Sequence, residues 1–368
     1  MKQILYKKKL LMDKKSKRTI YVVSNMYPSE EYPNYGVFVK RFIELISSQF
    51  IIVPITIKKQ SGVIAKIGSY IKLYLAVLKL LFIKNHDSTL IYVHFPLYVA
   101  PALLPFAWLN RKLVLNFHGS DIVFNTWYKK ILGFFLKKVV RRSRIVVPSV
   151  YYESEVVKVL GPQENNILVY PSGGVNESIF YPIEQNKDMF TLGFVSNFIM
   201  GKGWKIFLDS IEELIKGQYI GDFKAIMVGQ GKDKDAIIES IEKKKLPVTV
   251  RSNVPQEELL NVYALFDVFV FPSYRKEESL GLVGIEAMMC GIPVIASKTG
   301  GAMGYVKEAE NGYLFDLKDS AALTQKIIIY HQLSEMEKEK MRAHCLQKAS
   351  EYESKKVTKR LLEFLNEY

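Results

Sequence analysis

Two glutamates, Glu278 and Glu286, stand eight positions apart, on either side of a glycine that precedes an apolar run. Gly281 allows a tight turn, and the run that begins with Leu282 and Val283 predicts a helix. The first backbone N–H groups of a helix have no acceptor within it and favour a phosphate. Glu286 follows in apolar sequence, where an unpaired carboxylate is costly and a hydroxyl-rich ligand such as ribose would satisfy it. These spacings predict a site for a phosphate-bearing ligand with hydroxyl groups, with solvated surface glutamates as the alternative.

Three further segments place candidate residues in loops after predicted strands. Residues 192–203 read LGFVSNFIMGKG and residues 116–122 read NFHGSDI, while the third segment covers residues 28–39. Taken singly, their residues have ordinary explanations: a surface lysine, a structural histidine and a turn glycine. The candidates are Asn197 and Lys202 in the first segment, His118 and Asp121 in the second, and Gly36 in the third.

These residues must be positioned by an alternation of short apolar runs and longer helical patterns that begins at Thr19. The predicted strands are 20–24, 50–56, 90–94, 112–117 and 144–148 in the first half, and 192–196, 224–229, 248–251, 268–272 and 293–297 in the second. Helical patterns separate them, and this alternation predicts an α/β fold with parallel sheets covered on both faces. The series restarts near Leu192, so we expect two Rossmann-like, doubly wound domains facing a central cleft. Ligands should bind at the carboxyl ends of the strands.

The segment 271–301, FPSYRKEESLGLVGIEAMMCGIPVIASKTGG, resembles the signature of the retaining nucleotide-sugar glycosyltransferases of family four (glycosyl transferases group 1), which have the GT-B fold. That signature is a glutamate, seven residues, a second glutamate, a helix of small residues and a PVIAS-type strand. The resemblance implies that Glu286 binds the ribose hydroxyls of the donor nucleotide and that Glu278 contacts hydroxyls of the donor sugar. The backbone at Gly281, Leu282 and Val283 would hold the diphosphate.

Other motifs follow in the order of that family. Lys202 matches a lysine that neutralises the leaving diphosphate, whereas Asn197 stands where the family has an arginine and can donate a hydrogen bond without charge. His118 matches a histidine that faces and positions the donor sugar. Gly36 matches a glycine at which the backbone approaches the donor phosphate and the acceptor. The resemblance therefore implies catalytic roles for His118, Glu278 and Lys202.

The same resemblance extends to the nucleotide base, the acceptor and the domain boundaries. Arg251 and Val254 lie in the region that contacts the base, and His94 and Asp121 are assigned to the acceptor side. We expect a basic N-terminal arm at 1–18, an acceptor-side domain at 19–175, a nucleotide-sugar-binding domain at 176–350, and a C-terminal helix at 351–368 that returns to the first domain. The stretch 170–182, rich in Pro, Gly, Ser and Asn, is the expected linker.

The implied reaction moves a hexosyl or N-acetylhexosaminyl group from a nucleotide-diphosphate sugar to a hydroxyl and keeps the anomeric configuration. A UDP-sugar is the expected donor, with no cofactor, and we expect no metal because no His/Cys cluster with metal spacing is present. The expected acceptor is a glycan or a polyprenyl-diphosphate-linked glycan, in bacterial cell-envelope, capsule or exopolysaccharide synthesis. A GT-B sugar-nucleotide epimerase or hydrolase, and a non-catalytic glycan-binding or scaffolding pseudoenzyme, are the alternatives.

Charge is distributed unevenly along the chain. The formal net charge is +14, to which residues 1–180 contribute +16 and residues 181–368 contribute −2. This favours an anionic partner. The segments 64–84 and 127–144 mix basic with apolar residues and predict either a face that lies on an anionic membrane or core helices with a solvated basic edge. No nucleic-acid-binding motif accompanies the charge, so nucleic acid is not an expected partner.

The composition bounds the class of protein. With 49% hydrophobic and 24% charged residues, the chain is neither disordered nor collagen-like. Its apolar runs fall short of the ~20 residues that cross a bilayer, and no signal peptide is visible. Two cysteines, Cys290 and Cys345, are too few for a disulfide framework or a metal site. We therefore expect a cytoplasmic protein, with peripheral attachment to the inner face of the cell membrane as a further expectation.

Overall fold

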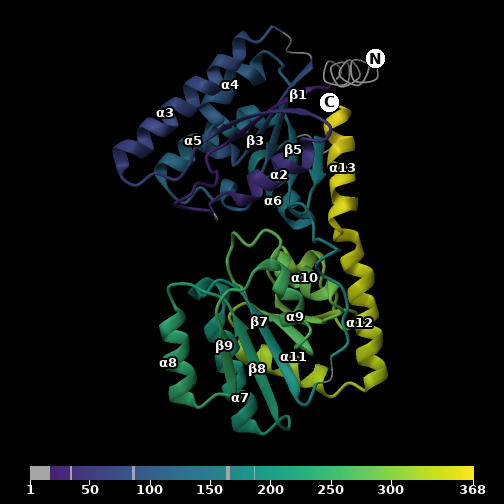
Figure 1. The fold of residues 1–368 in the computed structure, drawn as a ribbon. Helices are drawn as coiled ribbons and strands as arrows, with labels where there is room; N and C mark the ends of the chain where they lie inside the picture. The colour runs from purple at the N-terminus through teal and green to yellow at the C-terminus, as the bar shows by residue number, and fades with distance from the viewer. Residues whose placement is uncertain (1–16, 34, 85–87, 163–165, 186) are drawn as a thin grey trace, which may run out of the picture. The chain divides into compact units, whose positions relative to one another are not determined.

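The computed structural model describes residues 17–33, 35–84, 88–162, 166–185 and 187–368. The chain forms two compact units, one of Met1–Ser172 with Thr358–Tyr368 and the other of Gly173–Val357 (Figure 1). Of the predicted basic arm at 1–18, all but Lys17 and Arg18 lies outside the described residues.

The first unit contains a six-stranded parallel sheet in the order β2-β1-β3-β4-β5-β6. Its strands are β1 (Thr19–Ser24), β2 (Ile51–Thr56), β3 (Thr89–His94), β4 (Leu113–Asn116), β5 (Arg144–Val147) and β6 (Ile167–Val169). The helices between them are α2 (Val37–Ile46), α3 (Val63–Lys79), α4 (Ala100–Trp108), α5 (Trp127–Val140) and α6 (Val150–Leu160). Parallel neighbours need long crossover connections, and these helices provide them.

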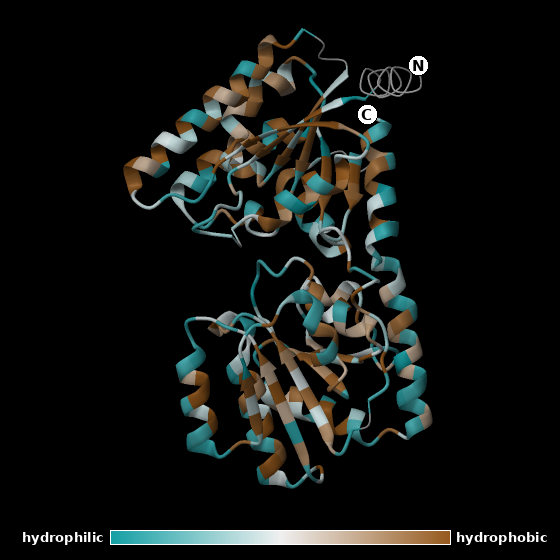
Figure 2. Cartoon of the chain, viewed as in Figure 1, coloured by the Kyte–Doolittle hydropathy of each residue, from teal (hydrophilic) through white to brown (hydrophobic). Residues whose placement is uncertain are grey.

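The two faces of this sheet bury different helices, because alternate residues of a strand point to opposite sides. On β3, Ile91 and Val93 belong to a core that α3, α4, α5 and α6 share. Tyr92, between them, stacks instead on Phe42 of α2, with ring centroids 4.3 Å apart. Strands β3 and β4 are buried along their whole length, and Figure 2 shows them as apolar. The continuous apolar runs in the sequence thus reflect burial on both faces.

The second unit contains a six-stranded parallel sheet in the order β12-β11-β10-β7-β8-β9. Its strands are β7 (Phe190–Val195), β8 (Phe223–Val228), β9 (Val248–Arg251), β10 (Val268–Phe271), β11 (Val294–Ser297) and β12 (Gly312–Phe315). Its helices are α7 (Trp204–Gly217), α8 (Lys234–Lys244), α9 (Leu259–Tyr263), α10 (Leu282–Met289), α11 (Ser320–His331) and α12 (Glu335–Ala349). The order reverses between β7 and β10, which makes this a doubly wound sheet.

Helices cover both faces of the second sheet. Leu192 and Phe194 of β7 pack in a core with α7 and α11. Phe269 and Phe271 of β10 belong to the opposite core, together with α9, α10 and α12. The neighbouring strands β7 and β10 thus stand in the middle of the sheet, each covered by helices.

The chain passes between the units at Ser172–Gly173 and again inside the last helix, α13 (Ser354–Asn366). These two crossings are hydrogen-bonded to each other. The Val175 N–H donates to the Tyr352 carbonyl at 2.8 Å, and the Ser354 N–H donates to the Val175 carbonyl at 2.9 Å. Gly174 has φ +72°, and a Cβ there would lie 2.4 Å from the Tyr352 carbonyl oxygen, so the close approach needs glycine.

The α/β fold with two parallel sheets is confirmed, and each of the ten predicted strands overlaps an observed one. Two edge strands, β6 and β12, were not predicted. β6 has three residues, all half-buried, and β12 begins with a glycine. No helix among the described residues combines the length and the apolar character needed to cross a membrane.

Gly193, in the middle of β7, provides a test of the second core. A Cβ at this position would lie 2.1 Å from the Phe266 ring, so Gly193→Ala should lower the free energy of unfolding by about 1–3 kcal/mol. Gly221→Ala is the matched control, because a Cβ there meets nothing within 4 Å, and its effect should stay within about 0.5 kcal/mol. Urea denaturation followed by circular dichroism measures both, and equal midpoints would contradict this packing.

Candidate functional site

The loops after β7 and β10 meet at the carboxyl ends of two neighbouring strands. One leads into α7 and the other into α10, which lie on opposite faces, and such a reversal point is where doubly wound sheets bind ligands. The Tyr274 N–H donates to the Gly201 carbonyl at 3.0 Å. Gly203 has φ +79°, and a Cβ there would lie 2.0 Å from the Pro272 carbonyl oxygen. The contact therefore depends on backbone-to-backbone approach.

Lys202 and Glu278 form an ion pair across this contact. The Lys202 Nζ lies 2.5 Å from Glu278 Oε2, and the two side chains are 16% and 11% exposed. Ser273 Oγ donates to the same carboxylate oxygen at 2.8 Å. Two predicted residues that are 76 positions apart in the chain are thus in contact. Ser273, which sequence analysis did not single out, also binds the Glu278 carboxylate. The pair places an ammonium and a fixed carboxylate at the strand ends.

The helix α10 begins beside this pair without a side-chain cap. Gly281, its N-cap residue, has φ +80°, and a Cβ there would lie 2.7 Å from the Phe271 ring. The Tyr305 hydroxyl donates to the Gly281 carbonyl at 3.1 Å and fixes this turn. The N–H groups of Leu282 and Val283, at the start of the helix, have no acceptor within it, so they can bind an anion.

Glu286 lies inside α10 and is 8% exposed. Its Oε2 accepts a hydrogen bond of 2.9 Å from the hydroxyl of Tyr263, the last residue of α9. Burial raises the Tyr263 pKa well above its usual value, and the nearby Glu286 charge raises it further, so the hydroxyl stays a donor. The carboxylate therefore has a partner within the protein before any ribose binds. Sequence analysis did not single out Tyr263 as a site residue.

The remaining predicted donor residues lie apart from the Lys202–Glu278 pair. Asn197 is exposed in the loop after β7, and its side chain takes no part in the ion pair. Arg251 ends the edge strand β9 and is exposed, while Val254 is half-buried against the core beside α9 and α10. Cations of the loops after β7 and β10 take part in ion pairs. Lys202 pairs with Glu278, and Arg275, in the loop after β10, lies 3.8 Å from Glu277.

In the first unit, two histidines meet at the carboxyl ends of β3 and β4. His94 Nδ1 lies 2.9 Å from His118 Nε2 and 3.3 Å from Asn116 Nδ2. Burial lowers the pKa of both rings, well below the usual value for His94, whose pKa the neighbouring His118 lowers further. Because burial lowers both pKa values, both rings are neutral near pH 7, and their hydrogen bond joins an N–H of one ring to a lone pair of the other. His118 can therefore give or accept a hydrogen bond but does not carry a charge.

Aromatic rings and a buried carboxyl group hold His118 in place. Phe95 stacks on its ring at 4.5 Å between centroids, and Phe38 of α2 lies 4.8 Å away. Gly36, the N-cap of α2, has φ +76°, and a Cβ would lie 2.7 Å from the Met26 carbonyl carbon, so this loop also needs glycine. Asp121 Oδ2 accepts the His118 backbone N–H at 2.7 Å. The four predicted residues His94, His118, Asp121 and Gly36 therefore belong to one edge of the first sheet.

The buried Asp121 makes stability depend on pH. Burial raises its pKa to about 7, above an unfolded value near ~3.9, so the folded state binds more protons between about pH 4 and pH 7. The free energy of unfolding then falls as pH rises through this window and levels off above it. Asp121→Asn removes this loss, so its stability relative to the wild type should rise by more than about 1 kcal/mol from pH 5 to pH 8.

Asp222→Asn is the control for this prediction, because Asp222 is exposed. Urea denaturation at each pH gives the difference in unfolding free energy. A difference between Asp121→Asn and the wild type that is constant over this range would show that Asp121 does not titrate near neutrality.

Comparison with known proteins identifies relatives of the second unit. Residues 175–351 match the family model described as Glycosyl transferases group 1. An uncharacterised glycosyltransferase of Methanocaldococcus jannaschii is 28% identical over 260 residues, which cover 67% of this chain and 66% of that protein. CapM, a capsular polysaccharide biosynthesis glycosyltransferase of Staphylococcus aureus, is 28% identical over 181 residues, which cover 45% of this chain and 46% of CapM. The matches thus span two thirds or less of these relatives.

Solved structures match almost the whole chain. Sucrose-phosphate synthase from Thermosynechococcus elongatus has a TM-score of 0.75 and 17% identity, covering 95% of this chain and 99% of its own. HepE of Anabaena, in complex with UDP, has a TM-score of 0.70 and 19% identity, covering 95% of this chain and 100% of its own. At these identities the likeness establishes the fold. The chain therefore has the GT-B fold, and residues 175–351 are similar to the glycosyl transferases group 1 family.

Proposed function

We propose that the chain is a glycosyltransferase that moves a hexosyl or N-acetylhexosaminyl group from a UDP-sugar to a hydroxyl of a glycan or lipid-linked glycan, with retention of configuration. The observation that carries the proposal is the Lys202–Glu278 pair beside the uncapped start of α10, at the reversal point of the second sheet. The family match over residues 175–351 supports it. So does HepE of Anabaena, a structural neighbour that is solved with UDP-glucose.

Each part of the donor has a group in the second unit that suits it. The diphosphate is bound by Lys202 and by the N–H groups of Leu282 and Val283, since an ammonium and a helix start both favour anions. Glu278, held by Lys202 and Ser273, accepts hydrogen bonds from hydroxyls of the sugar. Glu286 binds the ribose hydroxyls. Tyr263 holds its Oε2 from the other side.

The chemical step breaks the bond between the anomeric carbon and the phosphate oxygen and forms a bond to the acceptor oxygen. The acceptor proton passes to the leaving phosphate, so the protein need supply no base. Its contribution is to stabilise charge on the leaving diphosphate, through Lys202 and the α10 dipole. The assignment of His118 to the donor sugar, of Arg251 and Val254 to the base, and of the acceptor to the first unit stays a prediction.

We propose further that the diphosphate binds without a metal ion. The sequence contains an Asp-x-Asp spacing at Asp233 and Asp235, but Asp233 Oδ2 accepts a hydrogen bond of 3.0 Å from the Trp204 indole. Asp235 lies in the first turn of α8 and is exposed. Lys202 and the start of α10 take the role that a metal has in other transferases. Addition of EDTA should therefore leave donor binding unchanged.

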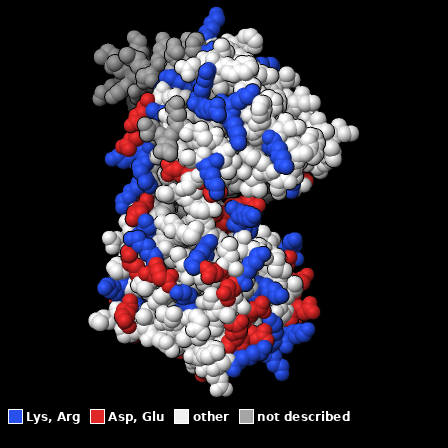
Figure 3. Space-filling model, turned by 180° about the vertical axis from the view of Figure 1, so that it is seen from behind, with Lys and Arg blue, Asp and Glu red and all other residues white. Residues whose placement is uncertain are grey.

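We propose that the acceptor belongs to cell-envelope or capsule synthesis and that the enzyme works on the inner face of the membrane. CapM, a relative, acts in capsular polysaccharide biosynthesis. On α3, the aliphatic residues Ile64, Ile67, Ile71 and Leu75 follow one another along the helix and are 55–89% exposed. Residues 45–84 contain no acidic residue, and basic side chains outnumber acidic ones over much of the first unit in Figure 3. Such a surface suits anionic lipids.

A variant of Glu286 tests the donor site. Glu286→Ala removes the carboxylate that binds ribose, so the KM for the UDP-sugar should rise by about 10- to 100-fold, because a hydrogen bond to a charged group contributes ~1.5–3 kcal/mol. Glu258→Ala, an exposed glutamate of the same unit, is the control. UDP release is measured with a panel of UDP-sugars, and NMR of the product reports the anomeric configuration. Unchanged donor affinity in Glu286→Ala would contradict the ribose assignment, and an inverted product would contradict retention.

Membrane attachment can be tested with the exposed row on α3. Ile67→Ser/Ile71→Ser should lower binding to liposomes that contain anionic phosphatidylglycerol by about tenfold, because each buried aliphatic side chain contributes up to ~1.5–3 kcal/mol. Ile215→Ser, an exposed residue of α7, should leave binding unchanged. Co-sedimentation at low salt measures the bound fraction. Equal liposome binding by these variants would contradict a contact between α3 and the membrane.

A further inference from the structure

A polar cavity of about 170 Å³ lies within the first unit, beside the carboxyl ends of β1 and β2. The loop after β1 supplies Asn25 and Tyr35, and the residues after β2 supply Lys58 and Lys59. The first half of α3 closes it with Lys66 and Tyr70. None of the described residues that line the cavity is acidic. The ammonium groups of three lysines around one space offer hydrogen-bond donors to an anion.

Asn25 marks the inner wall of this cavity as a binding surface. Its side chain is buried, with 9% exposed, and its Nδ2 donates to the Tyr70 hydroxyl at 3.1 Å. The other end of the amide, Oδ1, is buried without a partner. Because the two ends of an amide exchange by rotation, the unpartnered end can present an N–H once the Tyr70 hydroxyl donates to the oxygen. A buried polar group without a partner is costly, so a ligand that pairs with it is stabilised.

Within the described part of the chain, no ion pair involves the three lysines of this cavity. Lys59 Nζ lies 4.0 Å from the centre of the Tyr32 ring, a cation–π contact that holds it but leaves its charge. Lys58 and Lys66 are exposed at their ends of the cavity. Burial raises the pKa of Tyr35 and of Tyr70, so both hydroxyls stay protonated. The Tyr35 hydroxyl donates to the Asn25 carbonyl, and the Tyr70 hydroxyl donates either to a ligand or, after the amide rotates, to the Asn25 side chain. A phosphate group matches this set of donors.

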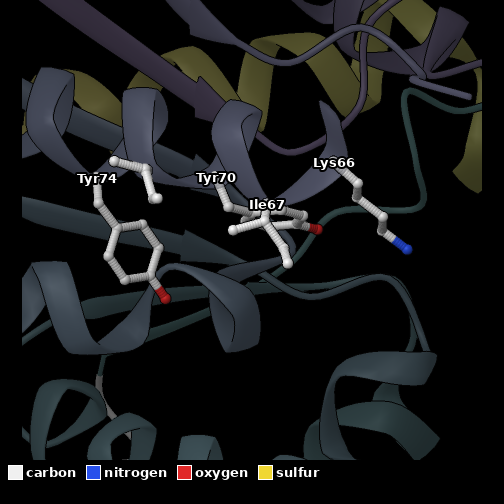
Figure 4. Close-up of a pocket in the computed structure, with 5 residues that line it drawn as sticks. Lys66, Ile67, Tyr70 and Tyr74 are labelled. Atoms are coloured by element: carbon white, nitrogen blue, oxygen red, sulfur yellow. The ribbon is translucent and has the colours of Figure 1, made fainter. Parts of the chain in front are cut away.

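An apolar groove continues from the polar cavity along α3. Lys66 and Tyr70 line both spaces, and Ile67, Ile71 and Tyr74 complete the second, which has a volume of about 350 Å³. Figure 4 shows these side chains in a row along one side of α3, with Lys66 at one end and Tyr74 at the other. The Tyr74 hydroxyl donates to the Tyr98 carbonyl at 2.7 Å, which fixes its ring. The charged end and the apolar length therefore form one continuous surface.

We propose that this cavity and groove bind a lipid phosphate, with the phosphate or diphosphate among Lys58, Lys59 and Lys66 and the hydrocarbon chain along Ile67, Ile71 and Tyr74. The proposal rests on the transferase function above and specifies its acceptor as one that carries a phosphate bonded to a hydrocarbon chain. Ile67 and Ile71 belong both to the exposed apolar row of α3 and to the groove, so such a chain can enter from a bilayer surface. A soluble phosphate fills the cavity alone, and a neutral lipid fills the groove alone.

The test compares three probes on the full chain by isothermal titration calorimetry: farnesyl diphosphate below its micelle concentration, inorganic pyrophosphate, and farnesol. UDP is present in excess, so that the donor site is occupied. Farnesyl diphosphate should bind at least about tenfold more tightly than pyrophosphate, because the chain adds apolar burial. Farnesol should bind at least as weakly as pyrophosphate. Equal affinity for farnesyl diphosphate and pyrophosphate would show that the hydrocarbon chain does not bind in the groove.

Variants assign the two halves of the ligand. Lys58→Gln/Lys66→Gln should weaken farnesyl diphosphate and pyrophosphate alike by about tenfold or more, since each lost charge-assisted bond contributes ~1.5–3 kcal/mol. Ile67→Ser/Ile71→Ser should weaken farnesyl diphosphate only. Lys79→Gln, an exposed lysine in the last turn of the same helix, is the matched control and should change neither. The proposed site would be wrong if these variants bound farnesyl diphosphate as tightly as Lys79→Gln does.

The same samples separate this proposal from the transferase function. UDP titrated into the wild type and into Glu286→Ala reports on the second unit alone. If UDP binds and sugar is transferred while the α3 variants behave like the control, the lipid-phosphate site is wrong and the transferase function stands. If farnesyl diphosphate binds with the expected variant pattern but no UDP-sugar is bound or consumed, the site stands and the transferase function is wrong.

Discussion

The close pairing of the loops after β7 and β10 is the constraint on which the second unit depends. Parallel strands end at one edge of a sheet, and the strand order places β7 beside β10 although 72 residues separate Val195 from Val268. Gly203 lets one loop lie against the Pro272 carbonyl, where any larger residue would collide. That approach brings Lys202 to Glu278. Without it, a lysine and a glutamate on separate loops would be solvated surface charges with little effect on each other.

Sequence patterns predicted the elements that are buried on both faces, because burial demands continuous apolar runs. The central strands β3, β4, β7 and β10 were all found in this way. Two of the four edge strands, β6 and β12, were not predicted, whereas β2 and β9 were. β6 is short and half-buried, and β12 starts at Gly312, where φ is +158° and the Val294 carbonyl lies too close for a side chain. A run of three residues, or one that begins with glycine, is too short an apolar pattern to predict a strand.

The candidate site was predictable as a set of residue types but not as a set of contacts. Glu278 and Glu286 share a segment, so their spacing could be read directly. Tyr263 and Ser273 act through the packing of α9 and of the loop after β10, and no local pattern distinguishes them from core residues. The pairing of His94 with His118 follows from the adjacency of β3 and β4, which is a property of the sheet. Contacts between residues that are far apart in the sequence can be predicted only once the arrangement of the strands is known.

In the proposed donor site, the Lys202–Glu278 pair is compatible with asparagine, rather than arginine, at position 197. An ammonium has three N–H donors, and Glu278 uses one of them, so Lys202 can hold the carboxylate and a phosphate at once. Glu278 fixes the direction of the lysine, which lowers the entropy lost when a diphosphate binds. A second cation beside Lys202 would compete with it for the same carboxylate. In the proposed reaction, the oriented Lys202 charge and the α10 dipole stabilise the leaving diphosphate, and both are present before the donor arrives.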